Sequence, residues 1–308
     1  MTNKIAAIQG NHPSKLNPKT DTSVFLANEI QRKKYKIFYY DPKDLSLVNS
    51  KVVAKGFFIK FDYNKKKFFK ILNRKRLELV KCKFILIRQD PPFNLEYIST
   101  TYILDLIKNK VKILNNPSAI RNISEKLYSA KYLKYMPETI FTQNIQEIRK
   151  FFKVHKKVIL KPTHGFSGND IHLLKKFNLK FILKFIKKHD HIVCQKYLPN
   201  ISKGDKRVFL INGKVGGAIS RIPKKGSFLS NMSKGAKPTN AKLTKKENLI
   251  SRIIAKDLKK ENIFFAGIDF IDQKLNGDIN VTSPTGLKTL YDLTGVNHAI
   301  TFWKELKT

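Results

Sequence analysis

The sequence predicts an α/β protein whose first 120 residues form a doubly wound sheet. Short apolar segments with the length and composition of buried strands occur at 4–9, 35–40, 57–61, 84–87 and 111–114. Helical segments follow two of these strands, at 21–34, where Asp21 or Thr22 can cap the first turn, and at 96–109. Alternation of strands and helices in this order is typical of doubly wound sheets.

Ligands of doubly wound sheets bind beyond the carboxyl ends of the strands. Two segments are expected there, 9–12 after the first strand and 88–93 after the fourth. Taken alone, the second segment, Arg88-Gln89-Asp90-Pro91-Pro92-Phe93, is a turn stiffened by its two prolines. The lysine-rich segment 62–70 is expected to be an exposed hairpin.

After Asn115-Asn116-Pro117 the pattern changes to a second series of strands and helices. We expect helices at 118–133, 145–154, 178–188, 244–260 and 294–306. We expect strands at 139–142, 157–161, 171–174, 191–196, 205–210 and 214–220. Thr244 and Glu247 have the spacing of a capping box, and Trp303 in the last helix is expected in the core.

The loop 163–170 lies between two predicted strands and contains Gly165 and Gly168. Amides of such a loop can fold over phosphate groups, although most Gly-x-x-Gly loops are plain turns. The chain has no Gly-x-x-x-x-Gly-Lys-Ser/Thr motif, so a Walker-type nucleotide site is not supported.

The segment 265–286 reads as two apolar strands joined by a turn that contains Asn276-Gly277, a strong hairpin signal. Side chains alternate along a strand, so a loop with an even number of residues places Asp269, Asp278 and Asn280 on one face. A two-residue Asn-Gly loop would leave Asp269 too far along its strand, and we therefore expect a longer loop of the same parity. Two carboxylates and an amide oxygen are hard ligands of the kind that Mg²⁺ prefers.

The alternative for this hairpin is a half-exposed ribbon whose polar face is simply hydrated. Composition favours the metal site, because the chain has only 23 acidic residues in 308, yet 269–278 holds three of them. A carboxylate cluster in so basic a chain is expected to hold a cation.

A net charge of +38 normally suggests nucleic acid. Here lysine is spread along the whole chain instead of gathering in a tail, and only nine of the 61 basic residues are arginine. This distribution indicates a lysine-biased composition, and we expect no dedicated nucleic-acid partner. Arginines retained in such a chain are candidates for planar, two-pronged contacts, among them Arg88, Arg121, Arg207 and Arg221.

The two cysteines, Cys82 and Cys194, fit no metal or redox spacing, and the first ten residues are not a signal peptide. No segment approaches the roughly 18 apolar residues of a membrane helix. We expect a cytoplasmic protein without a membrane partner.

Several segments, in order along almost the whole chain, resemble prokaryotic glutathione synthetases, which are ATP-grasp ligases. They are Arg88 to Phe93, Asn116-Pro117, Arg121 with Glu125-Lys126-Leu127, Leu160-Lys161-Pro162, Gln195 to Pro199, Gly204 to Val208, Arg221-Ile222-Pro223, Gly267-Ile268-Asp269 and Ile279 to Thr285. The resemblance implies an α/β (α+β) ATP-grasp fold with an N-terminal Rossmann-like domain. It divides the chain into a substrate domain at 1–120, a small lid subdomain at 121–198 and a catalytic subdomain at 199–308.

Members of this family phosphorylate the carboxylate of γ-glutamylcysteine with ATP, and glycine then attacks the acyl phosphate. The resemblance therefore implies ATP as co-substrate, two Mg²⁺ ions that Mn²⁺ could replace, γ-glutamylcysteine and glycine as substrates, and a homo-oligomer. Phosphoryl transfer depends on positioning and charge neutralisation, so the absence of an evident nucleophile or base is expected.

Site residues follow from the matching positions. Contacts to ATP are implied for Lys126, Lys161, Gly165, Gly168, Gln195, Lys196, Tyr197, Leu198 and Asp205. Arg207 and Arg221 would steady the transferring phosphoryl group, and Asp269, Asp278 and Asn280 would hold the metal ions. Arg88, Asp90, Ser283 and Thr285 would bind the peptide and glycine.

The chain departs from the family pattern at three places. Asp278 replaces the usual metal-bridging glutamate after one extra residue, Ser167 replaces a lid glycine, and Leu229 replaces an arginine in the loop 226–236. Alternative functions are therefore an ATP-grasp ligase for another peptide or amino acid, an ATP-binding protein without catalysis, and a basic nucleic-acid-binding protein.

Overall fold

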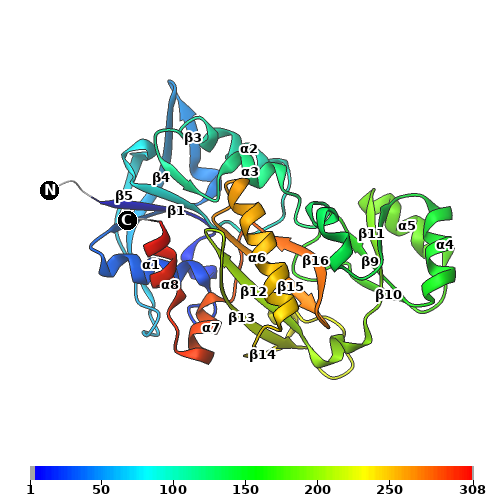
Figure 1. Ribbon diagram of the computed structural model, residues 1–308. Helices are drawn as coiled ribbons and strands as arrows, with labels where there is room; N and C mark the ends of the chain where they lie inside the picture. Colours follow the sequence, from blue (N-terminus) through cyan, green and yellow to red (C-terminus); the bar gives the residue numbers. More distant parts are fainter. Residues whose placement is uncertain (1–3, 307–308) are drawn as a thin grey trace.

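The computed structural model describes residues 4–306 and contains three sheets that follow one another along the chain (Figure 1). The first is built from residues before 115, the second from 139–196 and the third from 205–280. The second sheet and its helices project from one side of the molecule, and the third sheet lies between it and the first (Figure 1).

The first sheet has seven strands: β1 (Ile5–Gln9), β2 (Lys36–Tyr40), β3 (Leu45–Val48), β4 (Lys51–Phe61), β5 (Phe69–Glu78), β6 (Phe84–Ile87) and β7 (Lys112–Leu114). Strands β2, β1, β6 and β7 are neighbours in that order and run parallel, whereas β4 joins β2 antiparallel and carries β3 and β5.

Helices cover both faces of this sheet, as the predicted doubly wound architecture requires. Helix α1 (Thr22–Arg32) packs with Ala6 and Ile8 of β1, while α2 (Leu95–Asp105) and α3 (Pro117–Asn122) pack with Ile5 and Ala7. Successive residues of β1 thus enter opposite cores, because side chains alternate along a strand.

The second sheet has the order β10-β9-β11-β8, with all three pairings antiparallel. Its strands are β8 (Thr139–Thr142), β9 (Val158–Pro162), β10 (His172–Leu174) and β11 (Ile192–Lys196). Helices α4 (Ile145–His155) and α5 (Leu179–His189) bury Ile148, Ile182 and Phe185 against this sheet.

The third sheet has the order β14-β13-β12-β15-β16 and is antiparallel throughout. Its strands are β12 (Asp205–Ile211), β13 (Lys214–Ile222), β14 (Lys237–Asn240), β15 (Phe265–Ile271) and β16 (Lys274–Asn280). Helix α6 (Lys245–Lys260) packs on one face and begins with the predicted capping box of Thr244 and Glu247.

The last two helices, α7 (Leu287–Thr294) and α8 (His298–Glu305), return to the first sheet and pack against α1. Trp303 is fully buried there and donates a 2.9 Å hydrogen bond to the carbonyl oxygen of Leu26, which confirms its predicted place in the core. The segment that precedes the second sheet packs instead on the third, where Tyr132 and Met136 join the core under β16.

The elements differ from the sequence predictions in three respects. The expected helix at 118–133 is broken, because Ile123 is extended (φ −105°, ψ 90°) and a 3₁₀ helix, Leu127–Tyr135, follows. The expected helix at 294–306 is α8, which begins only at His298, and α7 before it, which ends at Gly295 with φ +71°, was not expected. The strands β3, β5 and β14 were not expected, because each is short or mostly exposed and shows no apolar pattern.

The turn of the β15–β16 hairpin also differs from the prediction. It lies at Asp272-Gln273, both with positive φ, and not at Asn276-Gly277. Asn276 and Gly277 belong to β16, where the pairing shifts between Ile268 and Phe270 and Gly277 has φ +87°. Residues 276–278 lie opposite Asp269 alone, so β16 carries two extra residues in a bulge, and this even number preserves the predicted parity. The longer loop that was expected is therefore wrong, because the turn itself has only two residues.

Within residues 4–306 no helix is long and apolar enough to cross a membrane. Both cysteines are free and buried, and burial raises the pKa of each thiol to about 12.

Candidate active site

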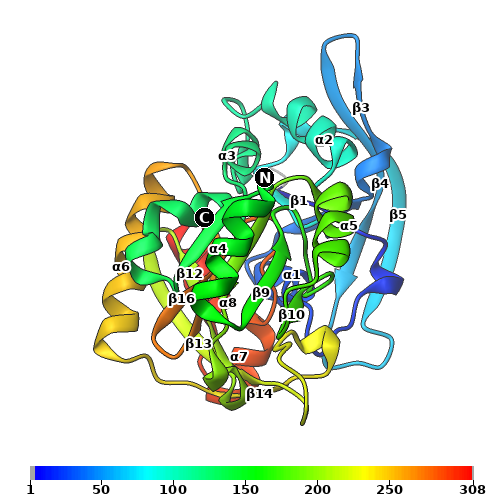
Figure 2. The same cartoon turned by 90° about the vertical axis from the view of Figure 1, so that its right-hand side faces the viewer.

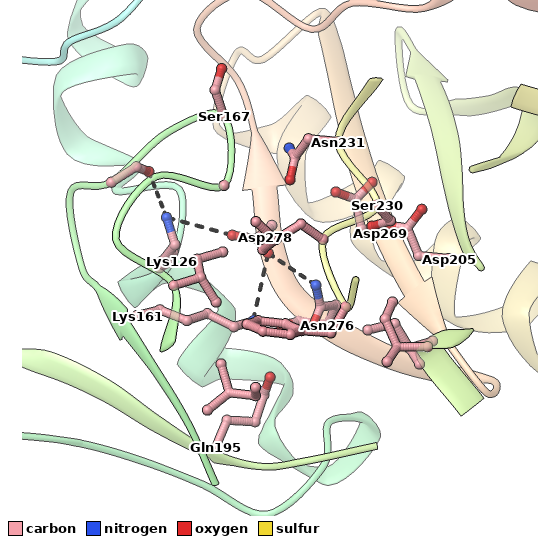
Figure 3. Close-up of a pocket in the computed structure, with 18 of the residues that line it drawn as sticks. Lys126, Lys161, Ser167, Gln195, Asp205, Ser230, Asn231, Asp269, Asn276 and Asp278 are labelled. Carbon is pink, nitrogen blue, oxygen red and sulfur yellow. Dashed lines mark hydrogen bonds and ion pairs between the residues drawn. The ribbon is translucent and has the colours of Figure 1, made fainter. Parts of the chain in front are cut away.

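A cleft lies between the second and third sheets (Figure 3). Side chains from β9, β11, β12, β13, β15 and β16 line it, together with Lys126 from the turn between α3 and the 3₁₀ helix Leu127–Tyr135. Two loops, at 165–169 and 228–231, border the same cleft. Most of the polar residues predicted for the site from sequence are thereby brought into one cavity.

Lys126 and Lys161 converge on Asp278, as Figure 3 shows. The Nζ atoms lie 3.6 Å and 3.7 Å from the two Asp278 carboxylate oxygens, and both lysines are buried. Lys126 also donates a 2.6 Å bond to the Gly165 carbonyl, and Lys161 donates to the backbone and side-chain oxygens of Asn276 at 3.0 Å. Burial lowers the pKa of Lys161, and Asp278 offsets part of this effect.

Asp269 on β15 accepts hydrogen bonds from two buried arginines. Arg207, its partner in the β12–β15 register, donates through Nε and, at 2.7 Å, through Nη2. Arg221 Nη2 lies 3.0 Å from Asp269 Oδ2. Burial alone would raise the pKa of Asp269, but the two guanidinium groups lower it to about 2, so the carboxylate is ionised at neutral pH.

Gly267 makes room for this arrangement. A methyl group on its Cα would lie 2.9 Å from Arg207 Cδ, so the bare backbone lets the arginine side chain pass across β15. The glycine of the Gly267-Ile268-Asp269 segment is thus explained by close packing.

Asp205 on β12 forms the other half of the same network. It accepts from Arg221, which faces it in the β12–β13 register, through Nε at 2.8 Å and also through Nη2. Ser230 of the bordering loop donates to Asp205 at 2.6 Å. Burial raises the pKa of Asp205, while Arg221 opposes the rise.

The carboxylates of the cleft suit a magnesium ion that is bound partly by the protein and partly by substrate phosphates. Asp269, Asp278 and Asn280 line one cavity, as the alternation along the hairpin predicted. Asn280 donates its amide to the Gly267 carbonyl at 3.3 Å, and within residues 4–306 no hydrogen bond involves its side-chain oxygen. Among the described residues no three His, Cys, Asp or Glu side chains form a ready-made metal cage. Mg²⁺ typically takes one or two carboxylates plus substrate phosphates, so the donor set fits.

The residues predicted to receive the adenine lie along the end of β11 and the turn after it. Gln195, Lys196, Tyr197 and Leu198 all line the cleft beside Ile159, Ile201 and Ile271. Apolar side chains on either side of a strand end form a slot suited to a flat ring. Gln195 Nε2 donates to Thr139 Oγ1 at 2.9 Å, which fixes its side chain.

The four residues predicted to bind peptide and glycine do not line this cleft. Arg88 is buried, and its Nε and Nη2 donate to Ser23 Oγ and to the Pro284 carbonyl, each at 3.0 Å. Asp90 accepts from Asn11 at 2.8 Å, and Ser283 donates to the Arg88 carbonyl at 3.3 Å. Thr285 is exposed. The contacts with Ser283 and Pro284 join the end of β6 to the segment after β16, and those with Asn11 and Ser23 join it to the loop after β1 and to α1.

Sequence reasoning missed several residues that the structure places in the cleft. Glu125 lines it, accepts from Thr282 Oγ1 at 2.8 Å, and has its pKa raised by burial. Ser230 and Asn231 enter from the bordering loop, and Asn276 bonds Lys161. For Glu125 the signal in the sequence is its position next to Lys126. Asn276 was missed because Asn276-Gly277 was interpreted as a hairpin turn.

Almost the whole chain is similar to known proteins of a single family. Residues 5–121 match the prokaryotic glutathione synthetase N-terminal domain, and 125–295 match the prokaryotic glutathione synthetase ATP-grasp domain. Glutathione synthetase of Buchnera aphidicola subsp. Baizongia pistaciae is 38% identical over 291 residues, which cover 92% of this chain and 90% of that one. The Agrobacterium fabrum glutathione synthetase is 33% identical over 99% of this chain and 96% of its own length.

Solved structures agree on the fold. D-cycloserine synthetase DcsG superposes with a TM-score of 0.67 at 11% identity, over 98% of each chain. At that identity the likeness concerns the ATP-grasp architecture alone.

Proposed function

The chain belongs to the prokaryotic glutathione synthetase family and is an ATP-dependent ligase of glutathione synthesis, and we propose that the cleft between its second and third sheets is where ATP phosphorylates γ-glutamylcysteine. The observation that carries this assignment is the convergence of Lys126 and Lys161 on Asp278. Two buried cations that share one carboxylate form a site for a triphosphate and its metal ion.

Lys126 and Lys161 bind the phosphates of ATP in this proposal. Each ammonium lies beyond 3.5 Å from Asp278, so neither is committed to a close ion pair there. Phosphate oxygens can take over these contacts without breaking a short salt bridge. The base of the nucleotide then extends toward Gln195 to Leu198 and the apolar side chains of Ile159 and Ile201, which line the same cleft.

Asp269, Asp278 and Asn280 would hold Mg²⁺ between the phosphates. The ion, when bound, neutralises charge on the transferred phosphoryl group. The lowered pKa of Asp269 keeps that carboxylate ionised, which a metal ligand requires. Aspartate at 278 is one methylene shorter than glutamate. In this proposal the bulge at Gly277 brings the backbone closer to the ion and so makes up for the shorter side chain.

Arg207 and Arg221 would hold the transferred phosphoryl group and the acyl phosphate. Both are buried, and both are fixed by carboxylates opposite them in the sheet. Hydrogen-bond donors that are already fixed stabilise a transition state well, because they need not reorient as negative charge develops on the phosphoryl group. The loops at 165–169 and 228–231 would exclude water from the acyl phosphate, so that its carbonyl carbon is attacked by the amine of glycine.

Arg88, Asp90, Ser283 and Thr285 remain proposed contacts for peptide and glycine. The hydrogen bonds of Arg88 with Ser283 and Pro284 join the first sheet to the segment after the third, and the peptide would lie across this junction. We also propose that the protein is cytoplasmic and forms a homo-oligomer.

Substrate dependence of ADP release tests the function. Purified protein with MgATP should release ADP only when both γ-glutamylcysteine and glycine are present, and mass spectrometry should find glutathione in equal amount. ADP release that ignores glycine but responds to another amine would assign the chain to a different ligase of the same fold. Replacement of Mg²⁺ by EDTA should abolish the release, and Mn²⁺ should restore it.

A further inference from the structure

A groove lies at the outer edge of β13 and shares no lining residue with the cleft. Strand β14 pairs only with 219–222, so within the described part of the chain no strand covers that edge along 214–217. Helix α6, which packs on β12 and β13 and lies at the left of Figure 2, lines the groove together with His298, the first residue of α8. The open strand edge is therefore accessible between two helices.

The backbone of this edge carries little side-chain cover. Three glycines line the groove: Gly213, Gly216 and Gly217. Gly216 has no partner on β12, because the β12–β13 register shifts there, and Gly217 has φ +125°. A Cβ on Gly217 would lie 3.1 Å from His298 Nε2. Glycine within a strand marks a bulge or a place where a ligand approaches the backbone closely.

Three cations line the groove, and their side chains have no hydrogen bond, ion pair or ring contact within residues 4–306: Lys242, Arg252 and Lys256. No Asp or Glu is among the lining residues. Arg252 and Lys256 lie at i and i+4 on α6, a spacing at which like charges destabilise a helix. The two cations therefore repel each other and have no carboxylate beside them that would offset the repulsion.

The acidic residues of α6 have partners away from the groove. Glu247 pairs with Lys206 at 2.8 Å, and Asp257 accepts a 3.0 Å hydrogen bond from Tyr132. None of these four residues lines the groove. The charges of the helix are thus separated, with its carboxylates engaged elsewhere and Arg252 and Lys256 left at the groove.

The lysine-rich composition does not account for Arg252, which is one of only nine arginines. Six of the others have an ion pair, a hydrogen bond or a ring contact: Arg32, Arg88, Arg121, Arg149, Arg207 and Arg221. A guanidinium binds the oxygens of a phosphate through two parallel N–H groups, which an ammonium cannot do. Asn248, one turn before Arg252, lines the groove too and adds an amide donor.

We propose that this groove, formed by Lys242, Asn248, Arg252, Lys256, His298 and the edge 213–217 of β13, binds an anion that contains two or more linked phosphoryl groups. Arg252 and Lys256 are about 6 Å apart along the axis of α6, so they contact neighbouring phosphoryl groups of such an anion. The open strand edge supplies backbone N–H donors from the other side. The proposal does not depend on the function assigned to the cleft.

Free oligophosphate and the phosphate chain of a nucleotide share this chemistry. The test is isothermal titration calorimetry on the full chain without divalent metal, at about 0.15 M salt, where exposed charges are already well screened. ADP is titrated first, and pyrophosphate is then titrated into the ADP-saturated protein. The ADP step occupies the cleft, so that pyrophosphate reports on the groove.

The double variant Arg252→Gln/Lys256→Gln removes both cations of α6 from the groove. Its matched control is Lys245→Gln/Lys246→Gln, which removes two exposed lysines of the same helix that do not line the groove. Both variants lower the net charge by the same amount, and thermal melting establishes that each is folded. The ring signals of His298 in NMR spectra, assigned by their absence in His298→Gln, report where the anion binds.

We expect ADP-saturated wild type and the control to bind one pyrophosphate with a micromolar Kd, and the groove variant to bind it about tenfold more weakly or worse. Two ADP sites in wild type and one in the groove variant would identify the phosphate chain of a nucleotide as the ligand. In either case the His298 signals should shift on binding. Absence of any site beyond the cleft, equal weakening in both double variants, or unshifted His298 signals would overturn the proposal.

Discussion

Lys234 Nζ donates a 2.8 Å hydrogen bond to Asn169 Oδ1. Asn169 belongs to the bordering loop 165–169, and Lys234 lies just after the bordering loop 228–231, in the same segment between β13 and β14. The same segment is tied to the site through Ser230 and Asp205. Closure of one loop is therefore linked to the position of the other.

Loss of this bond should uncouple ATP hydrolysis from ligation. In Lys234→Met the loops part more readily, water reaches the acyl phosphate, and the ratio of phosphate released to glutathione formed should rise, by about threefold for one hydrogen bond. Lys225→Met, an exposed lysine of the same segment, is the control, and Lys234→Arg should restore most of the coupling. A ratio of one in Lys234→Met would show that the bond has no part in closure.

Gly168 should be intolerant of a side chain because of the facing loop. Its φ is +72°, and an added Cβ would lie 2.4 Å from Asn231 Oδ1. Gly226 has φ +82° but nothing within 4 Å of an added Cβ, so it shares the backbone strain without the clash. Gly168→Ala should therefore raise the KM for ATP about tenfold, whereas Gly226→Ala should leave it near wild type. Similar KM values for the two variants would mean that strain alone decides the effect.

Substitution of Asp269 and of Asp278 should lower activity to the same extent but should differ in the effect on the stability of the fold. Each amide substitution removes a proposed metal ligand, so Asp269→Asn and Asp278→Asn should both lower Mg²⁺-dependent turnover by about two orders of magnitude. Asp269→Asn also leaves buried Arg207 without its carboxylate and should destabilise the fold by about 3 kcal/mol. Asp278 is only half-buried, accepts a 3.2 Å hydrogen bond from Asn276 and meets the two lysines at 3.6 and 3.7 Å, so its substitution should change the melting temperature less.

These two variants test the metal site and the ion-pair network separately. Magnesium titrations of turnover report the first property, and thermal melts report the second. Equal melting temperatures would show that Arg207 does not depend on Asp269, and full turnover in either variant would remove that residue from the site.

The acid stability of the protein should depend on Asp269. Its folded pKa of about 2 lies below the unfolded value, so the carboxylate stabilises the fold above about pH 4 and loses this effect as pH falls toward 2. The contribution at neutral pH is about 2 kcal/mol. Urea unfolding at pH 7, 4 and 3 should show a smaller decrease for Asp269→Asn than for wild type. Parallel pH profiles would exclude Asp269 as a source of the acid sensitivity.

Much of the architecture could be predicted from sequence because it depends on neighbours along the chain. Apolar runs and capping residues located β1, β2, β6, α1 and α6 to within a few residues. The break at Ile123 could not be predicted, because the residues around it have ordinary helical character. What distinguishes the segment is a contact with a distant loop, the hydrogen bond from Lys126 to the Gly165 carbonyl. Asn276-Gly277 misled the turn prediction because a bulge and a hairpin turn favour the same residues.

For the cleft, the sequence by itself determined which face of the hairpin carries Asp269, Asp278 and Asn280, because alternation along a strand is a local property. Only the tertiary structure decided what those side chains meet. Arg207 faces Asp269 and Arg221 faces Asp205 through the pairing of β12 with its two neighbours, and Lys126 and Lys161 arrive from two other parts of the fold. Such contacts depend on sheet register and on the packing of distant segments, which the order of residues along one strand does not specify.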